Sequence, residues 1–259
     1  MKKLFRVWSL YTRNSFSSAL YSRFGAGLFL VAKLLRFVLF AVFIFVLLNS
    51  TKALSGYTTY QVLFFYLVFN LLDTVTQLLF REVYRFRYKV VKGDFDLDLV
   101  QPMSPLFKSL AGGADILDLV MLVPSIALLI FVATKLTVTP WSIALSLVLF
   151  VNGFVIATAF HIIVLALGIL TTQVDHAIMI YRDLSNIGRI PLDIYQEPVR
   201  SFFTFVIPIG VMVTFPAKAL MGLLSIWGIL ISLVLGIGLF YVSLRLWRFA
   251  LTRYASASS

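Results

Sequence analysis

Six long apolar stretches constrain the fold of this chain more than any other feature. A helix needs about 20 apolar residues to cross the hydrocarbon core of a membrane. Stretches of about that length lie at Leu28–Leu48, Tyr60–Leu79, Gly113–Thr134, Trp141–Thr171, Phe202–Gly222 and Leu224–Leu246. Hydrophobic residues make up 61% of the chain and charged residues 13%, which leaves too little polar surface for a soluble domain of this length. The pattern predicts an all-α membrane protein with six transmembrane helices.

Basic residues alternate between rich and poor segments along the chain. The segments before the first span, at 80–108, at 172–200 and after the last span each hold several bases, whereas every other connection holds a single lysine. Cytoplasmic segments of membrane proteins carry the excess of Lys and Arg. We therefore expect both termini in the cytoplasm, in a multi-pass protein of the plasma or inner membrane.

This topology divides the chain into three predicted parts. Residues 1–24 carry an amphipathic pattern over Leu4–Leu20, typical of a helix in the cytoplasmic membrane interface, with a simple charged leader as the alternative. Residues 25–250 form the six-helix transmembrane domain. Its cytoplasmic connections are the loop 80–108 and the cytoplasmic or interfacial loop 172–200, and residues 251–259 form a polar cytoplasmic tail.

The loop 80–108 has a sequence that predicts two helices joined by a glycine. Bases alternate with apolar residues over Arg81–Lys92, which extends the second span as a helix. Gly93 is placed to end that helix, and Asp94 to cap a short helix over Phe95–Val100 before prolines stop it. A short helix across the membrane surface is suited to docking a soluble partner. The alternative is a solvated basic loop that only sets the topology.

Several polar residues fall inside the predicted spans, where they are candidates for function. Asn70, Asp73 and Gln77 share one helix face, and we expect them to make polar contacts between helices. Lys33 and Arg36 are expected to extend along the first span to the lipid headgroups. The alternative to simple interhelical contacts is a proton or cation relay formed by Asp73, Asp115, Asp118 and His161. In the loop 172–200, the neighbours Asp175 and His176 are most simply solvated surface residues.

The chain lacks the residues of several kinds of chemistry. It has no cysteine, which excludes disulfides and thiolate metal sites, and its two histidines are too isolated for an ordinary metal site. It has no phosphate-binding GxxxxGK[ST] motif and no HExxH or GxSxG motif, so we expect neither an enzyme nor a cofactor on this chain. Its net charge of +11 is concentrated beside apolar spans, which indicates lipid headgroups rather than nucleic acid.

Two local signatures add a family resemblance that covers nearly the whole chain. They are KGDFDLDLVQPMSPLF at Lys92–Phe107 and RIPLDIYQEPVRSFFTFVIPIGVMVTFPAKALMG at Arg189–Gly222. With six spans, a basic amphipathic N-terminus and a charged second cytoplasmic segment, the chain resembles the permease subunit of type-2 ATP-binding-cassette exporters. The resemblance implies a separate ATPase subunit that binds ATP and Mg²⁺, and a second permease copy or paralogue.

The resemblance also assigns roles to particular segments. The region Arg85–Gln101 would be a coupling helix that docks into the ATPase, and Phe215–Gly222 a short outer segment that caps the translocation path. The coupling residues would be Arg85, Arg87, Lys89, Gly93, Asp94, Asp96, Asp98 and Gln101. In other branches of the family a Pro…Ile-Tyr pattern lies on the outer face after the fifth span, whereas the bases of the loop 172–200 favour the cytoplasmic side here.

The chain is therefore expected to form half of the pathway of an ATP-driven exporter. The alternative is an ion- or proton-coupled transporter or channel that uses the four-residue relay named above. An enzyme acting on lipid would need a cluster of acids, bases or metal ligands in one plane, and the sequence contains none.

Overall fold

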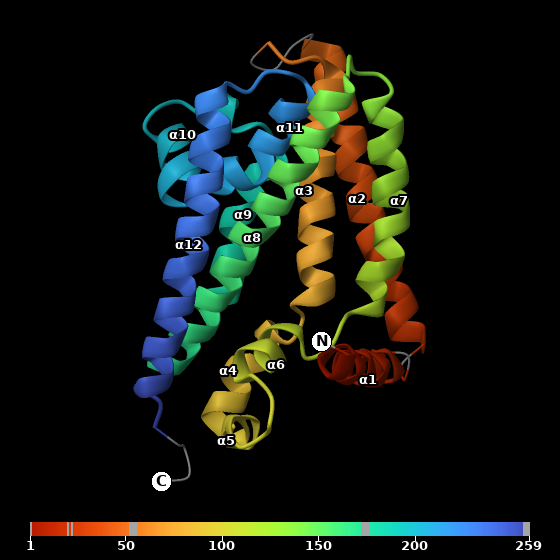
Figure 1. Cartoon of the computed structure of the whole chain (residues 1–259). Helices are drawn as coiled ribbons and strands as arrows, with labels where there is room; N and C mark the ends of the chain where they lie inside the picture. The colour runs from red at the N-terminus through yellow and green to blue at the C-terminus, as the bar shows by residue number, and fades with distance from the viewer. Residues whose placement is uncertain (1, 20, 22, 52–55, 172–176, 256–259) are drawn as a thin grey trace.

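The computed structural model describes residues 2–19, 21, 23–51, 56–171 and 177–255. Five helices in that part of the chain are long and apolar enough to cross a membrane, and a bent pair of shorter helices would be a sixth if it is counted as one span. The five are α2 (Arg23–Thr51), α3 (Thr59–Leu79), α7 (Ile116–Ala133), α8 (Pro140–Leu170) and α12 (Ile226–Thr252). They run along the long axis of the molecule, so five of the six predicted spans are confirmed (Figure 1).

The amphipathic helix predicted near the N-terminus is present as α1 (Lys2–Ala19). It lies across one end of the bundle (Figure 1). The same end carries α4 (Val83–Lys92), α5 (Asp94–Leu99), α6 (Pro105–Ala111) and the end of α12. We call it the terminal end, and the opposite end, where α2 leads into α3, the far end.

The predicted fifth span, Phe202–Gly222, is not a straight helix. It consists of the short α10 (Val199–Ser201), the π-helical turns η3 (Phe202–Val206) and η4 (Gly210–Thr214), and α11 (Phe215–Leu220). The two halves meet at an angle of 77°. Pro208, which has no backbone N–H to donate, lies in the break. Hydropathy alone does not distinguish a segment that crosses from one that enters and returns.

Hydrogen bonds place both ends of this hairpin at the far end of the molecule. The Tyr57 hydroxyl, in the connection from α2 to α3, donates to Asp193 at 2.8 Å. Lys218 of α11 donates to the other oxygen of Asp193 at 2.7 Å. The segment after Asp193 therefore folds in and comes back to the same end, as a re-entrant hairpin (Figure 1).

The prediction that residues 172–200 form a loop on the side of the termini is wrong for its second half. The chain passes from the terminal end to the far end through α9 (Ala177–Ser185), η1 (Asn186–Arg189) and η2 (Leu192–Ile194) (Figure 1). The guanidinium of Arg189 lies against the rings of Phe40 and Phe69, with centroids at 5.4 and 5.7 Å. A base held inside the protein carries no topology signal, which explains the error. Asp175 and His176 lie outside the described residues.

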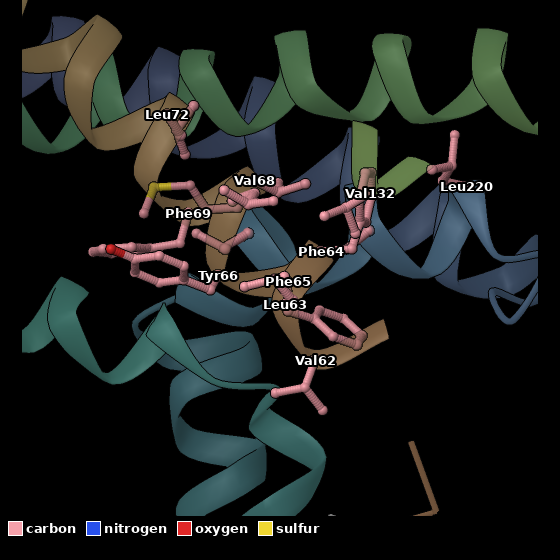
Figure 2. Close-up of a cluster of buried hydrophobic side chains, with 14 of the residues drawn as sticks. Val62, Leu63, Phe64, Phe65, Tyr66, Val68, Phe69, Leu72, Val132 and Leu220 are labelled. Carbon is pink, nitrogen blue, oxygen red and sulfur yellow. The ribbon is translucent and has the colours of Figure 1, made fainter. Parts of the chain in front are cut away.

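The core forms two clusters, one in the transmembrane part and one at the terminal end. The first gathers along α3, where Phe65 and Leu67 are fully buried, and Figure 2 shows Val132 and Leu220 beside the α3 side chains. Helices also approach closely: a Cβ on Gly153 of α8 would lie 2.3 Å from the carbonyl oxygen of Met212. Small residues that let backbones meet are typical of packing between membrane helices.

Candidate functional site

The predicted helix–glycine–helix element is present at the terminal end. Gly93 joins α4 to α5 with φ of 80°, a left-handed conformation that glycine adopts without strain. Ser104 then caps α6 by accepting from Phe107 N–H, and Pro105 occupies the first turn of that helix. The turn reverses the chain, so that α5 packs back against α4. We call α4, Gly93 and α5 the helix-turn element.

An aromatic cluster holds this element against the end of α12. Phe95 is completely buried and meets the rings of Phe86, Trp247 and Tyr254 at centroid distances of 5.0, 6.3 and 5.2 Å. The hydroxyl of Tyr254 donates to Asp96 at 2.8 Å. Burial and this carboxylate raise the pKa of Tyr254 to about 12, so the hydroxyl stays a donor at neutral pH. The element is therefore fixed to the end of α12, and the bonded residues Asp96 and Tyr254 lie 158 positions apart in the chain.

A second set of contacts, made of charges, fixes the inner side of α5. Asp98 is buried and pairs with Lys108 of α6 at 2.5 Å and with Lys89 of α4 at 3.8 Å. Lys89 also pairs with Glu82 at 2.6 Å, and Lys108 donates to Gln101 at 2.9 Å. Lys89, Asp96 and Asp98 thus hold the element together, whereas the sequence had suggested them as contacts to a partner.

The opposite side of the helix-turn element is apolar and exposed. Leu97 and Val100 are 63% and 80% exposed, and Tyr88 and Val91 of α4 are exposed as well. Of the residues predicted for this site, Arg85, Asp94 and Gln101 are exposed too, and Arg87 is half-buried. Sequence reasoning missed the anchor Phe95 and the outward Leu97. The alternation of acids and apolar residues in DFDLDLV was the available signal.

Inside the transmembrane part, polar side chains of four elements face one small cavity. Asn70 accepts from Ser125 of α7 at 2.9 Å, so the predicted interhelical contact is present. Gln77 donates to Asp73 one turn away at 2.7 Å. The cavity holds about 30 Å³ of water-accessible space, room for a water or two. This inner cavity is lined by Lys33, Arg36, Phe37, Phe40, Tyr66, Phe69, Asn70, Asp73, Thr74, Gln77, Asp118, Met121 and Arg189.

A larger cleft opens from the inner cavity toward the terminal end. Its volume is about 520 Å³, and it shares Lys33, Arg36 and Gln77 with the inner cavity. Its walls come from α2, the α3–α4 region and α9. This basic cleft is lined by Phe29, Ala32, Lys33, Arg36, Gln77, Arg81, Tyr84, Arg85, Met179 and Arg182.

Lys33 and Arg36 differ from their predicted positions. Lys33 forms an ion pair with Asp118 of α7, and both side chains are largely buried. Arg36 lines the cleft and the cavity rather than extending along the helix to the headgroups. Local sequence does not reveal Asp118, the partner charge on a neighbouring helix that holds Lys33 inside.

The four residues of the alternative relay do not gather at one place. Asp73 and Asp118 line the inner cavity, whereas Asp115 caps α7 by accepting from Leu117 N–H and pairs with Arg81 at 3.4 Å. His161 is buried, with Nδ1 2.7 Å from the carbonyl of Ala157 and its ring packed on Phe80 and Tyr181. Across the described ranges, no three His, Asp or Glu side chains are grouped as a metal site would need.

Comparison with known proteins agrees with these features. No curated protein and no solved structure matched the chain. A family model described as "ABC-2 family transporter protein" matches residues 34–258, which include all of the transmembrane helices except the start of α2. The chain therefore belongs to the ABC-2 family of transporter membrane proteins.

Proposed function

We propose that this chain is the permease half of an ATP-driven exporter and that a separate ATPase subunit drives it through the helix-turn element. One observation carries this proposal: an exposed apolar surface, Leu97 and Val100 above all, on a helix that is rigidly held at the terminal end. Apolar surface outside the membrane-crossing part indicates a protein interface.

The anchors of the element supply a route for the mechanical coupling. α4 continues from α3, and Phe95 and Asp96 bind α5 to the end of α12. A displacement of α5 by a partner is therefore transmitted to two transmembrane helices at once. A sequence that only set the topology would not need a buried aromatic anchor and a buried ion pair.

The terminal end would then face the cytoplasm, where the ATPase binds ATP and Mg²⁺. A second copy or a paralogue of the permease completes the pathway between the two halves. The re-entrant hairpin would lie at the outer face, with α11 capping the path. The hydrogen bonds of Asp193 with Lys218 and Tyr57 support that role, because they join α11 to the connection between α2 and α3.

Co-purification tests the proposal. The chain is expressed with a candidate P-loop ATPase subunit from the same organism, and the tagged permease is expected to retain that subunit. Leu97→Glu together with Val100→Glu places two charges on the docking surface and should abolish the co-purification and the ATPase stimulation. Arg23→Glu is the control, because it places a carboxylate at the start of α2, at the same end of the molecule but apart from the helix-turn element (Figure 1). Transport by the purified permease alone would contradict the proposal.

The alternative, an ion- or proton-coupled carrier, is left with one polar centre. Asp73 and Asp118 line the inner cavity, so a relay would have to run through these two carboxylates without Asp115 or His161. If the exporter proposal is right, the Asp73→Asn variant should still carry out ATP-driven transport. Its transport should not depend on a proton gradient. Loss of gradient-driven uptake in that variant would favour the carrier instead.

A further inference from the structure

The basic cleft and the inner cavity together carry an excess of positive charge. Six Lys or Arg side chains line them, against two carboxylates, those of Asp73 and Asp118. The charge of Asp118 is neutralised by its ion pair with Lys33, and the charge of Arg81 by its ion pair with Asp115 beside the cleft. Charges that are removed from water require a counter-charge or hydrogen-bonding partners. The protein supplies that counter-charge to only part of the set.

Three arginines form no ion pair in the described part of the chain, although Asp73 lines the inner cavity together with Arg36 and Arg189. Among the residues that the structure describes, no carboxylate oxygen lies within 4.0 Å of Arg36, Arg182 or Arg189. Arg189 rests between the rings of Phe40 and Phe69, whereas Arg36 and Arg182 line the cleft from α2 and from α9. Two guanidinium groups thus face one space from different walls.

The position of Arg36 along α2 makes this arrangement costly without a ligand. α2 starts at Arg23, and at 1.5 Å per residue Arg36 lies about 20 Å along the helix. The hydrocarbon core is about 30 Å thick, so the cleft reaches well into it. An exposed arginine at such a depth is expensive and indicates a functional site.

We propose that the basic cleft binds the phosphate group of an anionic amphiphile. Arginine donates two parallel hydrogen bonds to phosphate, which makes Arg36 and Arg182 the principal contacts, with Lys33 and Arg81 adding positive charge. Phe29, Ala32 and Met179 line the same cleft and offer apolar surface to the tail. The volume of about 520 Å³ fits a headgroup and the first part of a tail.

The proposal names a ligand chemistry with two possible sources. The amphiphile is either a phospholipid that stays in the cleft or the molecule that the transporter moves. The second source rests on the proposed function, because it makes the phosphate amphiphile the exported substrate. The binding site itself does not rest on it.

Binding is measured first, on the full-length chain without any ATPase. The chain is purified, placed in phosphatidylcholine nanodiscs, and titrated with phosphatidylglycerol or with further phosphatidylcholine, and bound lipid is read by native mass spectrometry. We expect a clear preference for phosphatidylglycerol that weakens with added salt. Arg36→Gln and Arg182→Gln should each weaken its binding about tenfold.

Two further variants make this measurement decisive. Arg245→Gln is the matched control, because Arg245 is an exposed arginine of α12 bonded to Tyr241, far from the cleft in the fold, and binding should not change. Arg36→Lys keeps the charge and should bind phosphatidylglycerol more tightly than Arg36→Gln but less tightly than the unmodified chain. If Arg36→Gln does not fold, Arg36→Lys takes its place in the comparison. Equal affinity for the two lipids, or an equal loss in Arg245→Gln, would overturn the site.

Movement is measured second, with the ATPase present. In proteoliposomes, ATP-driven transfer of labelled phosphatidylglycerol that is lost in Arg36→Gln identifies the amphiphile as substrate. Binding without transfer identifies a resident lipid, and the site stands. If the unmodified chain binds phosphatidylglycerol but retains no ATPase subunit, the proposed function fails while the anion site remains.

Discussion

At the scale of single residues, the pair of Lys33 and Asp118 shows how charge is arranged within the spans. Asp118 is almost fully buried, so removing its partner leaves a carboxylate in a low-dielectric setting. Lys33→Met is therefore expected to destabilise the protein by about 3 kcal/mol, whereas Lys33→Met combined with Asp118→Leu should be nearly neutral. Thermal unfolding in detergent measures both. Equal losses in the single and the double variant would show that the pair is not coupled.

The same pair marks where residue-scale prediction from sequence stops. The sequence shows that Lys33, Arg36 and Arg189 lie among apolar residues, but not whether each turns to headgroups, to a carboxylate or to an aromatic ring. In the structure Lys33 pairs with Asp118, Arg36 faces the cleft, and Arg189 packs on two Phe rings. Other helices supply these surroundings. By contrast, the contact of Asn70 and the pairing of Asp73 with Gln77 followed from helix spacing and a general need for polar partners.

Phe95 is the residue on which the helix-turn element depends. Phe95→Ala removes a buried ring from contact with Phe86, Trp247 and Tyr254, and should cost about 3–5 kcal/mol. Because the loss releases α5 from α12, ATPase co-purification should fall as well. Phe24→Ala, at a ring that is 85% exposed, is the control and should change neither quantity. Normal stability with lost co-purification would instead place Phe95 in the interface itself.

At the scale of elements, the close contact of α8 with η4 offers a sharp comparison between two glycines. A Cβ at Gly153 would lie 2.3 Å from a backbone oxygen, which cannot move without shifting the hairpin. Gly153→Ala should destabilise by about 1–3 kcal/mol. Gly238→Ala in α12 meets nothing within 4 Å and should be neutral or stabilising by roughly 0.5–1 kcal/mol. The difference in melting temperature between the two variants tests the packing.

Elements with local signals were predictable, and elements defined by their neighbours were not. Gly93 and the prolines after α5 determined the helix-turn element, because each acts on its own backbone. The predicted cap at Asp94 is wrong: Gly93 is the N-cap of α5, and Asp94 lies in its first turn without a capping hydrogen bond. The hairpin at 199–220 reads as a span because it is apolar throughout, although only its second half, from Gly210 on, is largely buried against protein. Only contacts such as Lys218 with Asp193 reveal that it returns to the end where it began.

At the scale of the whole molecule, the absence of cysteine makes the topology directly testable. Gly56→Cys and Gln196→Cys lie at the far end, and Gln101→Cys lies at the terminal end. A membrane-impermeant maleimide should label the first two from outside intact cells and label the third only after the membrane is opened. If Gln196→Cys, like Gln101→Cys, is labelled only after the membrane is opened, residues 190–200 lie on the same side of the membrane as the termini.

The carboxylate of Asp193 joins two separate segments at the far end of the molecule. Tyr57 and Lys218 each donate to one of its oxygens, and they come from the connection before α3 and from α11. Without this carboxylate the connection before α3 would lose its hydrogen bond to the hairpin, whereas α11 would stay packed on α8 through buried residues and the bond from Ser146 to the carbonyl of Pro216. One side chain therefore joins the loop before α3 to a helix that is anchored independently of it.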